Sequence, residues 1–448
     1  MDPASLALAE RSAPRYTSYP TAPHFSKSIG DRETRDWLAG LDPEASLSLY
    51  FHVPFCTAIC AYCGCHTKAV RQDAPLESYA QTLKSEIALF SKATRARRVA
   101  SIHWGGGTPG ILGASRFSSI VFVLRDHFDL SDETEHAIEL DPRILEADLV
   151  EALAAAGVTR ASLGVQDLNA HVQEASGRIQ PYETVARAVK LLRDGGVTAI
   201  NLDLMYGLPQ QSVEDAARTA SLAASLAPQR LAVFGYAHVP WFKSHQKLID
   251  AAALPGAGER LAQAAIVRET LEEAGFESIG LDHFARPDDP LAIAAREKRM
   301  RRNFQGYTID AADALLPFGV SSIGRFPQGY VGNATDLAGW RRAIESGRLA
   351  TTRGLAFTRE DIARAELIER LMCDFDVDYG AMALRHGYSE DAFDAAQASL
   401  DALAADGVID VQDRRIAVTE RGKPFVRLVA AAFDSYLQAA PARHSSAV

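Results

Sequence analysis

Four of the chain's five cysteines lie within a ten-residue segment, and no other feature of the sequence indicates chemistry so clearly. They are Cys56, Cys60, Cys63 and Cys65, and the first three have the spacing CxxxCxxC. Rare residues clustered in this way usually hold a metal. Three thiolates can bind three irons of a cubane iron–sulfur cluster and leave the fourth iron open for a small molecule, which is what a catalytic metal centre needs.

Two other interpretations of this cysteine loop stay open at the level of sequence. In one, the segment is a helix whose cysteines pack as small hydrophobic residues. In the other, it is a zinc site that also uses Cys65, His52 or His66, although zinc sites usually combine two CxxC knuckles and the chain has no second knuckle. We expect no fourth iron ligand from Cys65, because that ligand would close the open iron.

Several further residues are candidates for contacts with a nucleotide ligand. Three consecutive glycines, Gly105–Gly107, let the backbone approach a ligand closely, and their amides and carbonyls could grip the amino acid end of S-adenosylmethionine. Glu139 could accept hydrogen bonds from an ammonium group or a ribose, and Tyr62 could stack on an adenine. The alternatives are a surface carboxylate for Glu139 and simple core packing for Tyr62.

The elements that must position these residues follow a repeating β-then-α order between about residues 45 and 330. Short apolar, β-branched runs predict strands over Ser46–Val53, Ser101–Trp104, His136–Leu140, Arg160–Val165, Thr198–Tyr206 and Arg230–Tyr236. Stretches of helical periodicity follow them at Leu76–Phe90, Arg116–Phe128, Glu146–Ala156, Pro181–Asp194 and Val213–Ser225. This alternation predicts an α/β fold with a parallel sheet and right-handed crossovers, and six such units can curve into a partial (β/α)6 barrel.

Each unusual polar motif follows the carboxyl end of a predicted strand, where the active sites of parallel α/β barrels collect. In chain order these motifs are the cysteine loop, Gly105–Pro109, Glu139 with Asp141 and Pro142, Gln166 with Asp167, Asp203 with Tyr206–Pro209, and Tyr236 with Ala237 and His238. Because the carboxyl ends of parallel strands meet at one edge of a sheet, we expect these residues to surround one site.

We predict three parts of the chain. Residues 1–30 are rich in Pro, Ser and Tyr, and we expect them to form an extended N-terminal arm that contacts the substrate. We expect residues 31–355 to form the barrel. Residues 356–448 predict a smaller, mostly helical domain in which helices, a β-hairpin and a last helix resemble a winged helix. Since the chain is acidic, we expect this domain to cover or position a substrate rather than to read DNA.

The overall composition argues against several other classes of protein. The net charge is −10, whereas nucleic-acid-binding proteins are usually basic, so we expect no nucleic-acid partner. No apolar run reaches the roughly 18 residues that a membrane span needs, and the first twenty residues contain no apolar signal core. We therefore expect a cytoplasmic protein whose clustered thiols serve metal or redox chemistry rather than disulfides. The sequence does not indicate an oligomeric state, so a monomer is the default expectation.

The sequence resembles the radical S-adenosylmethionine (SAM) superfamily and, more closely, its oxygen-independent coproporphyrinogen III oxidases. The resemblance runs from Pro14 to about Leu437. It is carried by the segments Pro14–Ala22, Tyr50–Cys56, His103–Pro109, Gly164–Asp167, Asp203–Pro209, Asp282–Asp289 and Arg302–Thr308. Relatives that act as haem chaperones typically have CxF where this chain has Cys63-Gly64-Cys65, so the resemblance favours the enzymes.

The resemblance implies a [4Fe–4S] cluster and two SAM molecules. Cys56, Cys60 and Cys63 would ligate the cluster, and Glu139 completes the implied catalytic set. The first SAM would contact Tyr50, Gly106, Glu139 and Ile323, and the second would contact Tyr62, Gly107, Thr108, Gln166, Arg178, Asp203 and Ala237. The chain departs from the family pattern at Tyr62, where Phe is common, at Gly177, where Asn is expected, and at Gly110-Ile111, where Thr-Tyr is common.

The activity implied by the resemblance is the oxidative decarboxylation of coproporphyrinogen III to protoporphyrinogen IX in haem biosynthesis. A 5′-deoxyadenosyl radical would take hydrogen from propionate side chains of the substrate. The other implied partner is an electron donor such as a flavodoxin or a ferredoxin. A haem chaperone, or a radical SAM methyltransferase that modifies haem, is the alternative on the same scaffold.

The substrate would carry four carboxylates although the protein is acidic, so local cations must bind it. The basic run before Asn303 is a candidate, and we expect some of its members to bind propionates together with Arg15 of the arm. The run consists of Arg296, Lys298, Arg299, Arg301 and Arg302. The alternative for this run is a solvated helix face.

Overall fold

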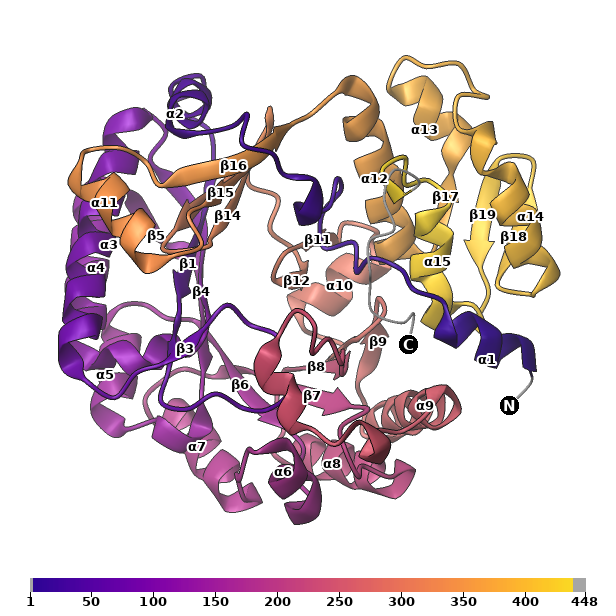
Figure 1. The fold of residues 1–448 in the computed structure, drawn as a ribbon, viewed down its shortest axis with the longest axis horizontal. Helices are drawn as coiled ribbons and strands as arrows, with labels where there is room; N and C mark the ends of the chain where they lie inside the picture. The colour runs from indigo at the N-terminus through magenta and orange to yellow at the C-terminus, as the bar shows by residue number, and fades with distance from the viewer. Residues whose placement is uncertain (1–2, 438–448) are drawn as a thin grey trace.

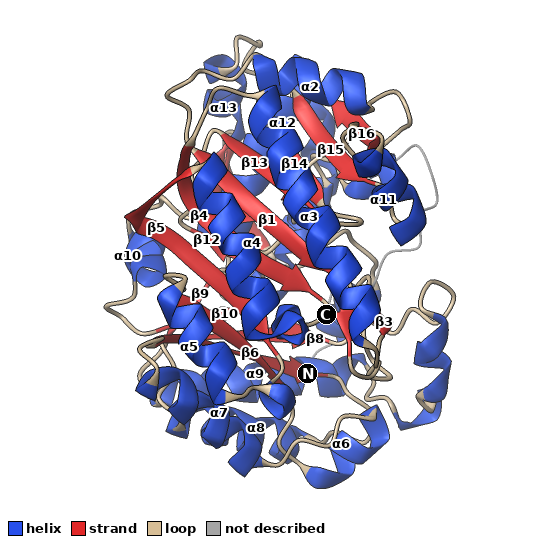
Figure 2. Cartoon of the chain, turned by 90° about the vertical axis from the view of Figure 1, so that its left-hand side faces the viewer, coloured by secondary structure: helices blue, strands red, loops and turns tan. Residues whose placement is uncertain are grey.

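A 12-stranded sheet with helices packed on its outer face organises most of the barrel in the computed structural model, which describes residues 3–437 (Figure 1, Figure 2). Six of its strands run parallel in chain order: β1 (Leu47–Val53), β4 (Arg98–Gly106), β5 (Asp129–Leu140), β6 (Arg160–Gln166), β7 (Ala199–Tyr206) and β8 (Arg230–Gly235). The helices that follow them are α3 (Asp73–Ala93), α4 (Gly113–His127), α5 (Ala147–Ala155), α6 (Ala170–Ser176), α7 (Tyr182–Asp194), α8 (Val213–Ser225) and α9 (Ala257–Glu273).

This order confirms the predicted α/β fold with six β-then-α units, and every predicted strand overlaps an observed one. The largest difference is in β5, which begins at Asp129 instead of His136 because its polar first half already pairs with β4. Alternating or continuous apolar residues therefore identified the buried parts of the strands, and a polar strand end gave no such signal.

The sheet continues beyond both ends of the predicted barrel. Next to β1 lies the parallel strand β13 (Ala314–Phe318), followed by the antiparallel strands β14 (Ile323–Phe326), β15 (Gly329–Asn333) and β16 (Thr351–Ala356). Beyond β8 lie β10 (His283–Ala285) and β9 (Glu277–Ile279), both antiparallel to their neighbours. As a result Ile323 is the first residue of a strand that lies close to β1 in the sheet.

The core of the barrel lies between the sheet and its outer helices. Phe51 of β1 is fully buried and stacks between Trp104 of β4 and Phe318 of β13, with ring centroids 4.2 and 4.6 Å from its own. Such buried aromatic stacks fix the lateral order of strands as well as contributing apolar burial. They hold β1, whose carboxyl end leads into the cysteine loop, in the middle of the sheet.

The remaining elements of the barrel connect or cover these strands. They are α2 (Asp31–Ala39), the short pairs β2 (Phe55–Cys56) with β3 (Lys68–Ala69) and β11 (Arg301–Asn303) with β12 (Gly306–Thr308), α10 (Pro290–Arg296), α11 (Leu337–Glu345) and the 3-10 turns η1 (Ala22–His24), η2 (Pro109–Leu112), η3 (Pro142–Ile144), η4 (Ser244–Leu248) and η5 (Ala251–Ala253). No helix within residues 3–437 is long and apolar enough to cross a membrane.

A second hydrophobic core lies under the C-terminal helices. The helices are α12 (Arg359–Asp374), α13 (Tyr379–Arg385), α14 (Gln397–Ala405) and α15 (Val426–Ala431), with the 3-10 turns η6 (Asp394–Ala396) and η7 (Lys423–Phe425). A three-stranded sheet of order β17 (Asp376–Asp378), β19 (Arg415–Val418), β18 (Ile409–Gln412) accompanies them. This is the predicted mostly helical, winged-helix-like part; its residues 438–448 lie outside the described part of the chain.

The N-terminal arm joins this second core instead of standing free. It begins with α1 (Pro3–Glu10), so the prediction of an extended arm is wrong for that stretch. Tyr16 and Tyr19 are buried among the C-terminal helices, and the Tyr16 hydroxyl donates to Asp434 at 3.0 Å. The conformation of the arm depends on its packing against another part of the chain. Its Pro- and Ser-rich composition contains no signal for that packing. Figure 1 shows α1 beside α15, and the arm then crosses in front of the sheet.

Candidate active site

The cysteine loop leaves the carboxyl end of β1 and returns to the same place. Its two ends pair as β2 and β3, where the amide of Lys68 donates to the Pro54 carbonyl (3.0 Å) and that of Val70 to the Cys56 carbonyl (2.9 Å). The residues between β2 and β3 contain no helix, so the interpretation of the cysteines as packing residues of a helix is wrong. The loop instead presents Cys56 from the end of β2, and Cys60 and Cys63 from non-repetitive backbone.

The glycine run is bonded directly to the cysteine loop. The amide of Gly107 donates to the Val53 carbonyl (2.8 Å), and that of Thr108 to the Phe55 carbonyl (2.8 Å). The Thr108 hydroxyl also lies 3.5 Å from the Cys56 sulfur. A Cβ atom on Gly107 would lie 2.5 Å from the Phe55 oxygen, so only glycine allows this contact. The two motifs therefore form one structural unit.

The cysteine side chains are set in different surroundings. Cys60 is buried, and a guanidinium nitrogen of Arg178 lies 3.5 Å from its sulfur. The Cys65 thiol donates to the Cys63 sulfur, which lowers the pKa of Cys63. Burial raises the pKa of Cys56. A cationic neighbour and thiol donors are groups that stabilise the thiolate form, which is the form that binds metal.

These thiols fit a cluster better than a single zinc ion. Among residues 3–437, no three His, Cys, Asp or Glu side chains are close enough together to share one metal ion. One ion would need sulfurs about 2.3 Å from a common centre. A cubane places its irons at separate corners, so three separated thiols on one loop suit it, and the chemistry of the donor set agrees.

A segment that sequence reasoning missed holds the far side of the cysteine loop. Lys243 donates to the carbonyl of Cys65 (2.9 Å), His245 Nε2 to that of Cys63 (2.6 Å), and Gln246 to that of Tyr62 (2.9 Å). These side chains come from the start of η4, after β8. Nothing in the sequence pattern pairs two segments so far apart in the chain.

The residues predicted for the first SAM gather at the ends of β1, β4 and β5. Glu139 accepts a hydrogen bond from the Gly106 amide (3.2 Å) and lies 3.1 Å from Nε2 of His103. The ring of Tyr50 stacks on His103 with a centroid distance of 5.9 Å. Gly106 has a φ of +109°, and a Cβ there would meet the His52 ring at 2.7 Å. His103, which sequence reasoning did not single out, therefore links Tyr50 to Glu139.

Ile323 approaches the same place from the other side of β1. The hydroxyl of its neighbour Ser322 lies 3.5 Å from the Tyr50 carbonyl oxygen. Ile323 itself is half-buried at the start of β14. Its place depends on the turn between β13 and β14, which no pattern in the sequence predicted.

Two residues predicted for the second SAM have unusual local structure. Gln166 adopts a left-handed φ of +68° at the end of β6, a conformation that costs energy for a residue other than glycine. Its side-chain oxygen and Nε of Arg178 are buried with no hydrogen-bond partner among the described residues. Arg178 also donates to the Gly164 carbonyl at 2.7 Å. Strain and orphaned polar atoms at a strand end are typical of a ligand site.

The other residues of this set have different surroundings. Asp203 accepts hydrogen bonds from Ser162 (2.8 Å) and Asn201 (2.7 Å), and burial, with the nearby charge of Glu139, raises its pKa to about 6. Tyr62 is buried beside Cys60, and Ala237, which follows β8, lines a cavity. The structure thus brings the predicted residues to one edge of the sheet.

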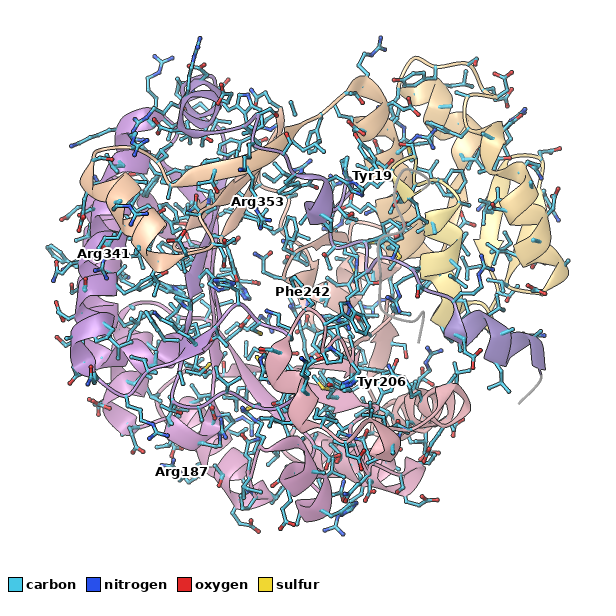
Figure 3. The ribbon with its side chains drawn as sticks, in the orientation of Figure 1. Tyr19, Arg187, Tyr206, Phe242, Arg341 and Arg353 are labelled. Carbon is cyan, nitrogen blue, oxygen red and sulfur yellow. The ribbon has the colours of Figure 1, made fainter. Side chains whose placement is uncertain are left out.

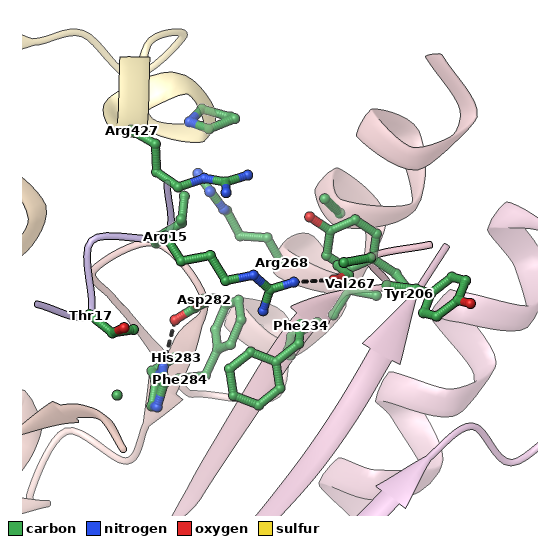
Figure 4. Close-up of a pocket in the computed structure, with 18 of the residues that line it drawn as sticks. Arg15, Thr17, Tyr206, Phe234, Val267, Arg268, Asp282, His283, Phe284 and Arg427 are labelled. Atoms are coloured by element: carbon green, nitrogen blue, oxygen red, sulfur yellow. Dashed lines mark hydrogen bonds and ion pairs between the residues drawn. The ribbon is translucent and has the colours of Figure 1, made fainter. Parts of the chain in front are cut away.

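That cavity, of about 390 Å³, is lined by residues of the arm, the ends of β7 and β8, α9, the segment that leads into β10, the β11–β12 ribbon and the C-terminal core (Figure 4). We call it the basic chamber. Five arginines line it, namely Arg15, Arg260, Arg268, Arg302 and Arg427, together with aromatic residues that include Tyr206, Phe234, Phe284 and Phe304. Asp282 is the one carboxylate among its described lining residues. The chamber therefore combines apolar surface with positive charge.

The predicted basic run does not act as a block. Arg296 pairs with Glu277 (2.6 Å), Arg299 with Glu297, Arg301 with Glu369 (2.8 Å) and Lys298 with Asp376 (3.9 Å). Arg302 alone of this run lines the basic chamber, where it meets Arg15 of the arm. The run ends in a two-stranded ribbon whose alternate residues face different sides, so a charge count could not separate them.

Comparison with known proteins gives consistent results along the chain. Residues 50–223 match the family model of the radical SAM superfamily, and residues 357–425 match that of the HemN C-terminal domain. An oxygen-independent coproporphyrinogen III oxidase of Bradyrhizobium diazoefficiens is 47% identical over 445 residues, which cover 99% of both chains. The enzyme of the same name from Escherichia coli is 39% identical over 97% of this chain and 95% of its own. The solved structure of the Escherichia coli coproporphyrinogen III oxidase, a radical SAM enzyme, superposes with a TM-score of 0.90 at 38% identity and covers 94% of this chain and 98% of its own.

Proposed function

Because the chain belongs to the oxygen-independent coproporphyrinogen III oxidases of the radical SAM superfamily, we propose that its cysteine loop, glycine run and basic chamber form one active site. The protein is a radical SAM oxidoreductase of haem biosynthesis. Its reaction turns two propionate side chains of coproporphyrinogen III into the vinyl groups of protoporphyrinogen IX. The identity over the whole chain overrides the alternatives of a haem chaperone and a haem methyltransferase.

Cys56, Cys60 and Cys63 hold the [4Fe–4S] cluster in this proposal. When bound, the cluster and SAM supply a 5′-deoxyadenosyl radical, which removes a hydrogen atom from the β-carbon of a propionate. Thr67 and Thr108 support Cys56 with hydroxyls at 3.3 and 3.5 Å, and Arg178 supports Cys60. The bonds from the glycine run and η4 fix the loop on two sides, so the thiols do not need to be organised when the cluster binds.

The first SAM lies along the ends of β1, β4 and β5. Glu139 would accept a hydrogen bond from the ammonium group of its methionine part, and carbonyls of the glycine run would accept from the same group. Tyr50 and Ile323 border the site on two sides, where they orient the nucleotide and keep water away. The observation that supports this most is the pair of bonds that joins Gly107 and Thr108 to the cysteine loop.

The second SAM lies beyond the first, against the ends of β6 and β7. Gln166 and Arg178 carry buried polar atoms without partners, and Asp203 offers a carboxylate for ribose hydroxyls. Tyr62, Gly107, Thr108 and Ala237 complete its surroundings. Radical formation needs only one SAM, so the second SAM site is proposed separately from the first.

The basic chamber holds the tetrapyrrole. Arg15 and Arg302 bind propionates of the substrate, and the aromatic residues lie against its apolar ring system. The arm (1–30), the barrel (31–355) and the C-terminal domain (356–448) each contribute to this enclosure, which keeps the radical away from solvent. An electron carrier such as a flavodoxin or ferredoxin supplies electrons to the cluster. The protein acts as a monomer.

Two sets of variants test this assignment. Alanine at Cys56, Cys60 or Cys63 abolishes cluster binding after anaerobic reconstitution with iron and sulfide, whereas Cys373→Ala retains the full iron content because Cys373 is buried in the C-terminal half. Arg302→Gln raises the KM for coproporphyrinogen III by about tenfold or more, since it removes a charge-assisted hydrogen bond. Arg301→Gln, with its side chain paired to Glu369, leaves that KM unchanged. Equal KM values for both arginine variants would remove Arg302 from the site.

A further inference from the structure

Several arginines of the basic chamber differ from other arginines nearby in the kind of group to which they donate hydrogen bonds. Arg15 donates to the backbone carbonyl of Gly235 (3.2 Å), and Arg302 donates to those of Tyr16 and Arg15 (both 3.3 Å). Arg268 forms no hydrogen bond or ion pair with any residue between 3 and 437 that the structure describes. A carbonyl dipole orients a guanidinium without neutralising its charge. In contrast, Arg296 and Arg301 outside the chamber pair with carboxylates.

The chamber charges also act on one another. Burial, together with the charges of Arg15 and Arg302, lowers the pKa of Arg427 to about 10. Arg15 likewise contributes to a lowered pKa of Arg260, after burial. Despite its burial, Asp282 keeps a pKa of about 2 because His283, Arg302 and Arg15 favour its charged form. The positive charges of the chamber are therefore close enough to repel one another.

Figure 4 shows how these side chains meet. Arg15 extends from the arm between Arg268 and Asp282, and Arg427 descends toward the same space from the C-terminal core. The Asp282 carboxylate forms a hydrogen bond of 2.7 Å with Nδ1 of His283. One carboxylate faces five guanidinium groups across the described lining, so the chamber gains from each further carboxylate that enters it.

The reaction changes how many carboxylates are present. At each propionate, the hydrogen atom goes to the 5′-deoxyadenosyl radical, the carboxylate leaves as neutral carbon dioxide, and one electron passes to an acceptor. The tetrapyrrole therefore loses one negative charge at each step. It enters with four carboxylates, has three after the first step, and has two after the second.

From these observations we propose that the basic chamber sorts tetrapyrroles by their number of carboxylates, so that the monovinyl intermediate stays bound and the divinyl product is expelled. This inference rests on the proposed substrate position in the chamber. The intermediate still brings three carboxylates to the guanidinium groups of Arg15, Arg268 and Arg302, whereas the product brings two and leaves one of these groups facing the other arginines. Charge repulsion among the arginines then favours release, and the two decarboxylations proceed on one bound molecule.

The binding test uses three unreactive, oxidised porphyrins as probes. They carry four, three and two carboxylates: coproporphyrin III, its monovinyl tripropionate counterpart and protoporphyrin IX. Dissociation constants are measured by fluorescence with the anaerobically reconstituted holoenzyme and SAM. We expect the affinity to fall by about tenfold with each carboxylate lost, in keeping with the loss of one charge-assisted hydrogen bond. We call the ratio of affinities between successive porphyrins the spacing. Higher ionic strength reduces this spacing, because salt screens the charges.

Variants locate the effect. Arg15→Gln and Arg268→Gln weaken the binding of coproporphyrin III by about tenfold each and leave that of protoporphyrin IX nearly unchanged, so the spacing shrinks. Arg299→Gln is the matched control, because it removes the same charge from an exposed side chain that pairs with Glu297 outside the chamber. Iron content and thermal midpoint verify that each variant is folded and loaded.

The kinetic test follows the intermediate. With substrate in excess, the wild type and Arg299→Gln release mainly the divinyl product from the first turnovers, whereas Arg15→Gln and Arg268→Gln release several-fold more monovinyl intermediate. Equal affinity of the wild type for all three porphyrins, or an unchanged spacing in both chamber variants, would overturn the proposal. In either case normal turnover to protoporphyrinogen IX would show that the proposed function itself still holds.

Discussion

Glu86 of helix α3 accepts a hydrogen bond from the backbone amide of Gly319, 2.6 Å away, in the core between the sheet and its outer helices. Its other oxygen accepts from the side chains of Asn333 and Trp340, both at 3.0 Å. Gly319 begins the turn between β13 and β14 with a φ of +92°. The helix that follows the cysteine loop therefore also fixes the turn that carries Ile323 toward the proposed SAM site.

Replacing Glu86 tests this connection. Glu86→Leu leaves three buried N–H donors without an acceptor and lowers the free energy of unfolding by about 3 kcal/mol or more, whereas Glu86→Gln keeps one acceptor and loses less. Both variants bind SAM more weakly, since the turn that carries Ile323 is no longer held. Denaturant unfolding and equilibrium SAM binding measure the two effects. Glu77→Gln, an exposed change on the same helix, leaves both values as they are; if Glu86→Leu did so too, the turn would not depend on Glu86.

The glycine run gives a prediction about backbone contact. Gly107→Ala places a Cβ 2.5 Å from the Phe55 carbonyl oxygen and from the Thr67 hydroxyl, so the cysteine loop must move. We expect this variant to lose most of its cluster after reconstitution. Gly64→Ala, which meets no atom within 4 Å, retains it. Iron and sulfide analysis separates the two variants, and full cluster content in Gly107→Ala would contradict the joint role of the two loops.

Asp203 gives a prediction about pH. Burial and the charge of Glu139 raise its pKa to about 6, against an ordinary value of 3.8, and Ser162 and Asn201 partly offset that rise. Its carboxylate is therefore mostly ionised at pH 7 and mostly protonated at pH 5. Because a raised pKa means that the folded state holds the proton more tightly, the stability from this group is present below pH 4 and is lost as the pH rises through 6.

In the proposed second SAM site, ligand binding follows the opposite course, since only an ionised Asp203 would accept hydrogen bonds from two ribose hydroxyls. We expect SAM occupancy at the second site to rise between pH 5 and 7. Isothermal titration of the loaded enzyme with SAM at several pH values measures this rise. In Asp203→Asn the occupancy becomes independent of pH in that range; a rise that persists in this variant would assign the titration to another group.

The part of the fold that sequence predicts is the part with a strong apolar pattern. Strands β1 and β8 are buried along most of their length, and β4, β6 and β7 alternate buried and half-buried residues, so all five have a clear apolar pattern. Their ends, and the polar residues that follow them, could therefore be placed in advance. The antiparallel extension was not predicted, because β15 (Gly329–Asn333) contains two glycines and an asparagine, which have low strand propensity. The role of Ile323 came from the family resemblance alone.

Part of the candidate site could likewise be predicted from the sequence, and part could not. The thiols, the glycine run and Glu139 are near one another in the order of the strands, so spacing was sufficient to relate them. The basic chamber brings Arg15 beside Arg427, and the cysteine loop contacts Lys243 and His245. Those contacts depend on how the arm and the C-terminal core pack against the barrel, and no local pattern encodes that packing. For the same reason the charge pattern before Asn303 predicts one basic group, although the members of this run face different partners.

The central claim is that three thiolates of one loop hold a cluster whose open iron binds SAM. It is tested most directly by anaerobic turnover of the reconstituted enzyme with coproporphyrinogen III, SAM and a reductant, with products counted by mass spectrometry. The account predicts one 5′-deoxyadenosine for each vinyl group formed, and neither product in Cys56→Ala, Cys60→Ala or Cys63→Ala. Vinyl groups formed without cleavage of SAM, or a colourless wild-type protein that holds stoichiometric zinc and cleaves no SAM, would contradict it.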